Sequence, residues 1–166
     1  MGLELLRAAT ITRPADTTAY ASGDLLANST TAGSVTPFTF SGGATPYRVQ
    51  RFWMRSSNNT ITNKAYTLYL YSASPTVTNG DNGAFVVATN NATLLGVFGS
   101  GAAVNTGAES INAFYPLDAA GTFANGWLPM LVTGTFYGLI KVNAAYTPTS
   151  AETFNIAAEV MMESAA

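Results

Sequence analysis

Nine carboxylates are the main reactive side chains of this 166-residue chain, which contains neither histidine nor cysteine. Without imidazole or thiol groups, the chain has no Ser-His-Asp or Cys-His nucleophile, no thiolate or imidazole metal site and no disulfide. Glycosidase chemistry would need two carboxylates roughly 5 to 10 Å apart across a cleft. Asp16, Asp24, Asp81, Glu109 and Asp118 are scattered through predicted loops and segment ends, and no spacing singles out a pair. We therefore expect a protein that is not an enzyme and uses no cofactor.

The sequence Asn79-Gly80-Asp81-Asn82-Gly83 looks at first like a calcium loop, because oxygen-bearing side chains alternate with glycines. It lacks the remaining acidic ligands and the closing bidentate glutamate of an EF-hand. Turn chemistry explains these residues better, because Asn, Asp and Gly adopt the backbone conformations of tight turns. We predict a turn here and no metal site.

The segment Tyr47–Arg55 concentrates three of the seven basic residues beside the large aromatic residues Phe52 and Trp53. In a regular strand, Tyr47, Val49, Arg51, Trp53 and Arg55 share one face, and Arg48, Gln50, Phe52 and Met54 share the other. Trp, Tyr and Arg are enriched at interface hot spots, and cations would suit an acidic partner surface. Alternatively, the aromatic residues belong to the core and the arginine stems cover sheet edges. We name Arg48, Arg51, Trp53 and Arg55 as candidate partner contacts.

A second candidate is the run Tyr66–Tyr71, in which Tyr69 and Tyr71 face opposite to Leu68 and Leu70. One pair is then in the core and the other pair is nearer the surface. An exposed tyrosine face would suit protein or sugar recognition, so Tyr69 and Tyr71 are further candidate contacts. The alternative is that these rings pack between two sheets with their hydroxyl groups at the rim.

Charge and hydropathy limit the classes of partner. Only 10% of the residues are charged, against roughly 25% in a typical soluble protein, and the net charge is −2. Disorder usually needs high net charge, and nucleic-acid binding needs a cluster of basic residues, so we expect neither. The stretch Met1–Thr12 is interrupted by Glu4 and Arg7, which argues against a secretory signal. Other apolar runs are far shorter than the roughly 18 residues of a membrane span, so we expect no membrane partner.

The periodicity along the chain is that of β-strands. Phe154–Met162 alternates apolar and mostly polar residues most clearly, and Leu131–Val142 places Val132, Phe136, Ile140 and Val142 on one face. Further short β-rich runs are predicted at Leu3–Thr12, Tyr20–Ala27, Val35–Phe40, Tyr47–Ser56, Ala65–Ser72, Gly83–Ala88 and Leu94–Phe98. The best helical candidates are single turns at Ala88–Leu95 and Leu3–Ala9.

Many short strands, frequent Gly and Pro turns and no interleaved helices predict an all-β fold. We expect a single antiparallel β-sandwich, jelly-roll-like, with at most one or two short helical turns. Residues 17–166 form the sandwich domain, and residues 1–16 are either its first strand or an extended N-terminal arm that adds to a neighbour's sheet edge. In the second case Leu3, Leu5 and Leu6 are candidate partner contacts.

Three stretches resemble small virion structural proteins of tailed bacteriophages: Ile11–Asp24, Asp81–Phe85 followed by Leu95-Gly96, and Tyr146–Phe154. The resemblance spans nearly the whole chain and rests on turn and strand-edge signatures, not on a catalytic motif. It implies a jelly-roll or related sandwich that decorates or cements the capsid by binding the major capsid protein. It also implies a homodimer or homotrimer on the capsid surface of the virion, after synthesis in the host cytoplasm.

Two other functions stay open at this point. A receptor- or carbohydrate-binding module of a phage tail would display aromatic residues such as Tyr69 and Trp53 on an exposed platform with acidic hydrogen-bonding partners. A head-completion or tail-tube component would form ring oligomers.

Overall fold

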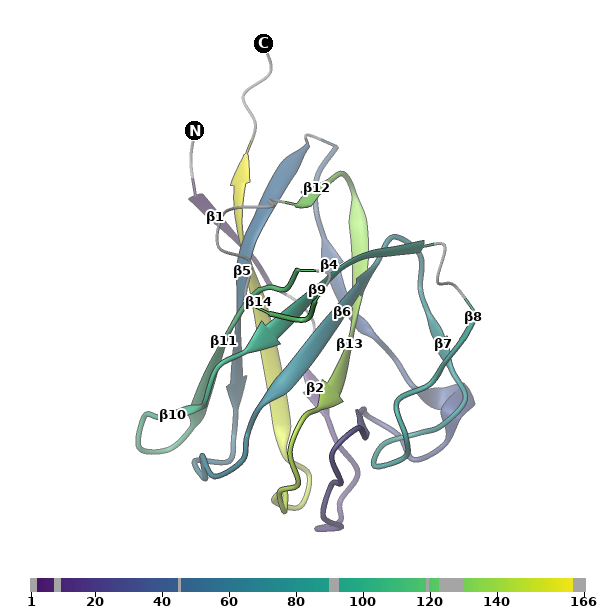
Figure 1. The fold of residues 1–166 in the computed structure, drawn as a ribbon, viewed down its shortest axis with the longest axis vertical. Coiled ribbons are helices and arrows are strands. Elements are labelled where there is room, and N and C mark those ends of the chain that lie inside the picture. The colour runs from purple at the N-terminus through teal and green to yellow at the C-terminus, as the bar shows by residue number, and fades with distance from the viewer. Residues whose placement is uncertain are drawn as a thin grey trace.

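A computed structural model describes residues 3–7, 10–44, 46–89, 93–118, 120–122 and 130–162. The described part of the chain is built from β-strands and one short 3-10 turn (Figure 1), as the sequence predicts. The elements are β1 (Leu3–Arg7), β2 (Ile11–Thr12), β3 (Leu25–Leu26), η1 (Ala32–Ser34), β4 (Phe38–Ser41), β5 (Tyr47–Ser56), β6 (Tyr66–Tyr71), β7 (Thr76–Val77), β8 (Val87–Thr89), β9 (Leu94–Ser100), β10 (Val104–Asn105), β11 (Ser110–Pro116), β12 (Met130–Val132), β13 (Thr135–Val142) and β14 (Thr153–Met162).

One antiparallel sheet carries almost all of these strands, in the order β1-β14-β5-β11-β9-β6-β13-β3. The short strands β2, β4, β10 and β12 pair with β14, β13, β11 and β5, and β7 pairs with β8 separately. The sheet curls, so that its first half (β1, β14, β5, β11) faces its second half (β9, β6, β13) in a sandwich-like arrangement (Figure 1).

Aromatic rings fill the space between the two halves. Phe52 of β5 meets Phe98 of β9 and Phe136 of β13, with ring centroids 4.9 and 6.4 Å apart. Phe40 of β4 stacks on Phe136 at 4.6 Å. On β14, the predicted alternation is confirmed from Phe154 to Val160, because the apolar positions Phe154, Ile156, Ala158 and Val160 are fully buried and the residues between them are partly exposed. These contacts supply the hydrophobic core that joins the halves.

A second apolar cluster covers the outer face of the second half. Tyr71 of β6 and Leu139 of β13 point away from the main core, and their side chains are nonetheless 3% and 2% exposed. Residues from the chain's own loops and small strands lie over them: Leu25, Ala27, Val35, Val77, Phe85 and Val87. The second half therefore has apolar packing on both of its faces.

A β-bulge in β5 corrects the predicted division of its two faces. The pairing with β14 places Arg51 opposite Glu159 but Val49 opposite Val160, so Gln50 is an extra residue. The alternation therefore changes phase at Gln50. Tyr47 and Val49 are buried with Phe52, Met54 and Ser56, whereas Arg48, Arg51, Trp53 and Arg55 all lie on the outer face.

Three other strand predictions were wrong: two predicted runs are each divided into two strands, and a third forms a much shorter strand than expected. The run Leu131–Val142 is divided into β12 and β13 by a turn in which Gly134 has a φ of 76°, a value that favours glycine. Leu3–Thr12 is divided into β1 and β2. In Tyr20–Ala27, only Leu25–Leu26 forms a strand, and Tyr20 and Asp24 make isolated bridges.

The sequence pattern missed β11 because its inward positions are polar. Ser110 and Asn112 are buried beside Phe114, while Ile111 and Tyr115 lie on the outer face. The helical candidate Leu3–Ala9 was wrong where the structure describes it, because residues 3–7 form β1. The candidate Ala88–Leu95 begins in β8 and ends in β9, and between these strands Thr93 has 3-10 conformation, with residues 90–92 outside the described part.

Candidate functional site

The outer face of the first half carries most of the candidate contacts. We define the arginine–tryptophan face as the outward residues of β5, β11 and β14 with the adjoining Val104 and Glu109: Arg48, Arg51, Trp53, Arg55, Val104, Glu109, Ile111, Ala113, Tyr115, Asn155, Ala157 and Glu159. Val104 is 63% exposed and Tyr115 is 42% exposed. All four candidate residues from β5 therefore lie on one partly exposed face, which the bulge makes possible.

Arg51, Trp53 and Glu159 form a hydrogen-bonded unit at the centre of this face. Arg51 Nε donates to Glu159 Oε2 at 2.7 Å, and Trp53 Nε1 donates to the same oxygen at 3.4 Å. The guanidinium of Arg51 lies over the Trp53 ring, 4.8 Å from its centroid. The hydrogen bond that Arg51 donates to Glu159 raises the pKa of Arg51. The three groups fix one another's orientation while part of each side chain stays accessible.

A second ion pair on the face is looser and more exposed. Arg55 Nη1 lies 3.8 Å from Glu109 Oε2, and the two side chains are 64% and 44% exposed. Pairs of this kind contribute little to folding stability. Arg55 and Glu109 are therefore available for contacts with another molecule at little cost to the fold.

Tyr69 and Tyr71 do not join this face. They belong to the cluster that covers the second half, where the Tyr69 ring stacks on Phe85 at 4.7 Å. Burial raises the pKa of Tyr71 to about 12. The predicted division of β6 is confirmed, because Leu68 and Leu70 lie in the main core and both tyrosines lie on the opposite face, where Tyr71 is buried and Tyr69 is partly exposed. The two rings do not pack between the halves of the sheet, and other residues of the chain lie over them. Tyr71 is not accessible as a partner contact.

The N-terminal candidates Leu3, Leu5 and Leu6 lie in β1, which pairs with β14 of the same chain. The backbone of Leu5 lies opposite Glu159, and that of Leu3 lies opposite Met161. The structure describes this strand through its backbone pairing, which places it beside the arginine–tryptophan face.

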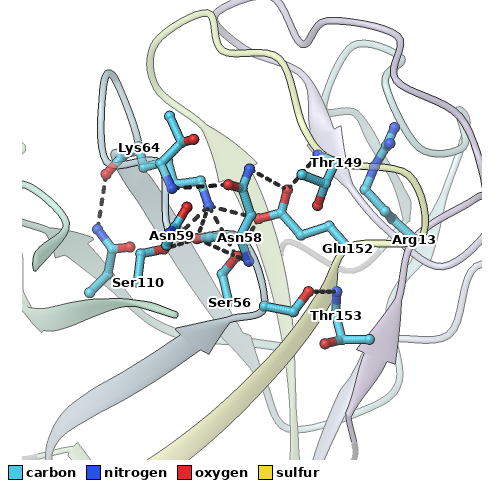
Figure 2. Close-up of polar contacts among 12 residues, drawn as sticks. Arg13, Ser56, Asn58, Asn59, Lys64, Ser110, Thr149, Glu152 and Thr153 are labelled. Atoms are coloured by element: carbon cyan, nitrogen blue, oxygen red, sulfur yellow. Dashed lines mark hydrogen bonds and ion pairs between the residues drawn. The ribbon is translucent and has the colours of Figure 1, made fainter. Parts of the chain in front are cut away.

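A buried polar cluster that the sequence did not indicate lies at the end of the sheet where β5 ends and β14 begins (Figure 2). Lys64 Nζ donates to Glu152 Oε1 at 2.8 Å, to the backbone oxygen of Asn58 at 2.9 Å and to Ser56 Oγ at 3.0 Å, and neither charged side chain is exposed. Ser110 Oγ is a further neighbour at 3.2 Å. The cluster joins the ends of β5, β6, β11 and β14.

Glu152 is equally surrounded by donors. Its Oε1 also accepts from Ser56 Oγ, and its Oε2 accepts from Asn58 Nδ2 at 3.3 Å and from the backbone N–H of Thr149 at 3.2 Å. Burial lowers the pKa of Lys64, and the hydrogen bond to Glu152 opposes that shift. Four oxygen atoms around Nζ favour the charged ammonium group.

The pairing of Ser56 with Lys64 invites comparison with Ser-Lys nucleophiles, which use a neutral lysine as the base. Here the lysine donates to a carboxylate, and Ser56 is 2% exposed. These contacts stabilise the charged lysine and keep the hydroxyl group away from the surface. We therefore assign the cluster a structural role in holding four strands together.

A second buried ion pair, between Arg13 and Asp81, lies at the turn of residues 79–83 that resembles a calcium loop, and it accounts for the acidic residue there. Arg13 Nη2 donates to Asp81 Oδ2 at 3.0 Å, and Asp81 Oδ1 accepts from Tyr20 Oη at 2.6 Å and from the backbone N–H of Ala27 at 2.8 Å. Burial raises the pKa of Asp81. Among the described residues, no group of three or more His, Cys, Asp or Glu is placed to hold a metal ion.

Two tyrosines connect the ion pairs. The rings of Tyr20 and Tyr146 lie 5.2 Å apart, with Arg13 5.2 Å from the first ring and Lys64 Nζ 5.5 Å from the second. The paired charges are 68 and 88 residues apart in the sequence. No local spacing rule links residues at such separations, so sequence patterns gave no signal for these contacts.

No family model and no curated protein matches this chain. The described residues include no helix that is both long and apolar enough to cross a membrane.

Proposed function

We propose that this chain is a structural protein of a tailed bacteriophage that decorates the capsid by binding neighbouring subunits of the major capsid protein. It works without a cofactor and without catalysis, on the capsid surface of the virion, after synthesis in the host cytoplasm. The observation that carries this proposal is the arginine–tryptophan face, which displays interface-prone residues on a sheet whose other half is covered by the chain's own loops.

The composition supports a role in assembly. Charged residues are only 10% of the chain, so its surface is rich in short Thr, Ser, Asn and Ala side chains. Short side chains lose little rotamer entropy when a contact orders them, which favours binding to a protein surface. A protein that contacts several capsid subunits at once gains further affinity through multivalency and stabilises the assembled shell by mass action.

The rigid ends of the sheet support the same role. Two buried ion pairs, Lys64–Glu152 and Arg13–Asp81, tie loops that are distant in the sequence to the ends of the strands. A preorganised surface loses less entropy on binding than a mobile one.

Co-sedimentation with heads tests the proposal. Purified protein is mixed with expanded heads of the phage that encodes it, from a mutant that lacks this protein, and the pellet is imaged by cryo-electron microscopy. We expect saturable binding at symmetry-related positions on the shell and a higher disruption temperature of the heads. Absence of binding, or density only at the portal or tail, would overturn the proposal.

A second candidate function rests on the contact between Trp53 and Glu159. An indole beside a carboxylate is suited to binding sugars, which would make the chain a receptor- or carbohydrate-binding tail module. One face of the Trp53 ring is occupied by Arg51, however, and Tyr69 is packed against Phe85. Binding to a glycan array without affinity for heads would favour this function, and ring oligomers would favour a head-completion or tail-tube component.

A further inference from the structure

An amine, a carboxamide and a carboxylate meet in the buried polar cluster of Figure 2. Lys64 Nζ donates to Glu152 Oε1 at 2.8 Å, and Asn58 Nδ2 donates to Glu152 Oε2 at 3.3 Å. Lys64 Nζ also donates to the backbone oxygen of Asn58 at 2.9 Å. The lysine amine and the asparagine carboxamide therefore share one carboxyl group, with each nitrogen on a different oxygen.

The carboxamide of Asn58 is held in one orientation. Its oxygen, Oδ1, accepts from the backbone N–H of Thr60 at 2.9 Å, while its nitrogen faces the carboxylate of Glu152. An N–H group aimed at a carbonyl oxygen stabilises the negative charge that develops there when a nucleophile adds to the carbon. Asn58 Cγ is thus activated on its oxygen side, and on its nitrogen side it lies next to a group that can carry protons.

Burial completes the chemical setting of these three groups. Lys64, Asn58 and Glu152 are 1%, 4% and 0% exposed, and the Tyr146 ring lies 5.5 Å from Lys64 Nζ. The interior disfavours an ammonium and a carboxylate as separate charges, and burial lowers the pKa of Lys64. Transfer of one proton from Nζ to Glu152 leaves a neutral pair, in which the amine has the free lone pair of a nucleophile.

We infer that Lys64 and Asn58 form an intramolecular isopeptide bond, with Glu152 as the proton carrier. After Nζ has given a proton to Glu152, its lone pair attacks Asn58 Cγ and forms a tetrahedral intermediate. Glu152 passes that proton to Nδ2 and takes a second proton from Nζ, the Cγ–Nδ2 bond breaks, and ammonia leaves. The products are an amide between Nζ and Cγ, a protonated Glu152 and one ammonia molecule. Atoms and charge balance, and nothing is oxidised or reduced.

The reaction occurs once in each chain and strengthens the structural role of the cluster. It replaces a buried ion pair by neutral groups, which removes the cost of keeping two charges in the interior. The new bond also closes residues 58–64, in the loop between β5 and β6, into a covalent ring that restricts the unfolded chain. The Lys64–Glu152 ion pair of the structure is the state before this reaction. The inference is independent of the proposed function, because the bond forms within an isolated chain.

Mass spectrometry of the denatured full chain tests the inference. The mass is measured on freshly purified protein and again after incubation of the folded protein at mildly alkaline pH. We expect most of the incubated chain to be about 17 Da lighter than its sequence mass, because one ammonia molecule is lost. An unchanged sequence mass after incubation would overturn the inference.

Digestion with trypsin locates the bond. Trypsin cleaves after a lysine with a free amine, so an unmodified chain releases residues 56–64 through cuts after Arg55 and Lys64. The cross-linked chain should instead give one fragment of residues 56–141, because Lys64 is blocked and Lys141 is the next basic residue. Release of residues 56–64 from the lighter chain would overturn the inference, because the ammonia would then come from another reaction, such as cyclisation of an asparagine.

Matched variants assign the roles of the three residues. Lys64→Met and Asn58→Ala should each keep their full sequence mass, and so should Glu152→Gln, which keeps hydrogen-bonding groups but cannot carry the proton. The control Asn59→Ala removes a neighbouring carboxamide that donates to the backbone oxygen of Gly107, and it should still lose ammonia.

Circular dichroism records whether each variant is folded, and the fragment map of the natural chain decides for or against the bond where a variant is not. Ammonia loss by Lys64→Met or Asn58→Ala would overturn the bond. Ammonia loss by Glu152→Gln would overturn the role of Glu152 as proton carrier.

Discussion

Lys64 and Glu152 form an ion pair in which neither side chain is exposed, with Lys64 Nζ 2.8 Å from Glu152 Oε1. The two residues are 88 positions apart, and the pair joins the turn before β6 to the start of β14. An ion pair in this setting is costly to break, because either partner alone would be a buried, uncompensated charge.

Removal of one partner should therefore destabilise the protein strongly. We expect Lys64→Met to lower the free energy of unfolding by about 3 to 5 kcal/mol, because Glu152 is left buried without its cation. The matched control is Lys141→Met at the chain's other lysine, which lies over the Tyr69 ring and should change stability by less than about 1 kcal/mol. Urea denaturation measures both, and equal losses would contradict the structural role of the cluster.

Alkaline pH should unfold the protein through its buried tyrosines. Burial raises the pKa values of Tyr20, Tyr66 and Tyr146 above the ordinary value of 10.0. Their contribution to stability is complete below pH 10 and is lost as the pH rises, because the unfolded chain then releases protons that the folded chain retains. Each group should lower the free energy of unfolding by about 1.4 kcal/mol per pH unit.

Denaturant titrations at a series of pH values, with tyrosinate absorbance and circular dichroism recorded together, check this expectation. The buried tyrosines should ionise only as the fold is lost, and Tyr146→Phe should make the pH dependence shallower. Ionisation of all tyrosines while the protein stays folded would show that these three rings are accessible to solvent.

Gly80 should not tolerate a side chain. A Cβ atom at this position would overlap the backbone carbonyl of Thr30, whereas nothing lies within 4 Å of a Cβ added at Gly33. We expect Gly80→Ala to destabilise the protein by about 2 to 4 kcal/mol and Gly33→Ala to be neutral or slightly stabilising. Thermal unfolding of the two variants checks the pair, and similar melting temperatures would argue against the close approach.

Gln50 should be dispensable to the fold, both as a residue and as a glutamine. Its deletion removes the bulge and leaves a regular alternation, in which Val49 and Phe52 still face inward and Arg51 still faces outward, so we expect the shortened chain to fold. Gln50→Met keeps the bulge and removes a buried side-chain oxygen without a hydrogen-bond partner, so stability should rise by about 1 kcal/mol. A deletion variant that does not fold, as judged by circular dichroism, would show that the bulge itself is needed for the fold.

The sequence predicted the ends of one strand and the buried face of another. The predicted run Tyr47–Ser56 has the same ends as β5, and the predicted apolar positions from Phe154 to Val160 are those buried in β14. The pattern failed for β11, because Ser110 and Asn112 occupy inward positions where their hydrogen bonds to the Lys64 region are made. A buried polar residue that is satisfied by a distant partner looks like a surface residue in the sequence.

The candidate site was predictable in its residues but not in its arrangement. Residue types singled out Arg48, Arg51, Trp53 and Arg55 as candidates. Regular alternation placed Arg48 on the opposite face from the other three, because the residue types in β5 do not indicate the bulge at Gln50. Tyr69 and Tyr71 were expected at an interior rim or an exposed platform, and the loop that carries Phe85 covers them instead.

The sequence by itself determined the all-β class, the short strands, the turn positions and the low charge, since strand periodicity and turn chemistry depend on neighbouring residues. Only the tertiary structure decided which half of the sheet is covered, which arginines share a face, and which four charges meet in the interior. Those outcomes depend on pairing register and on contacts between residues far apart in the chain, which local pattern does not encode.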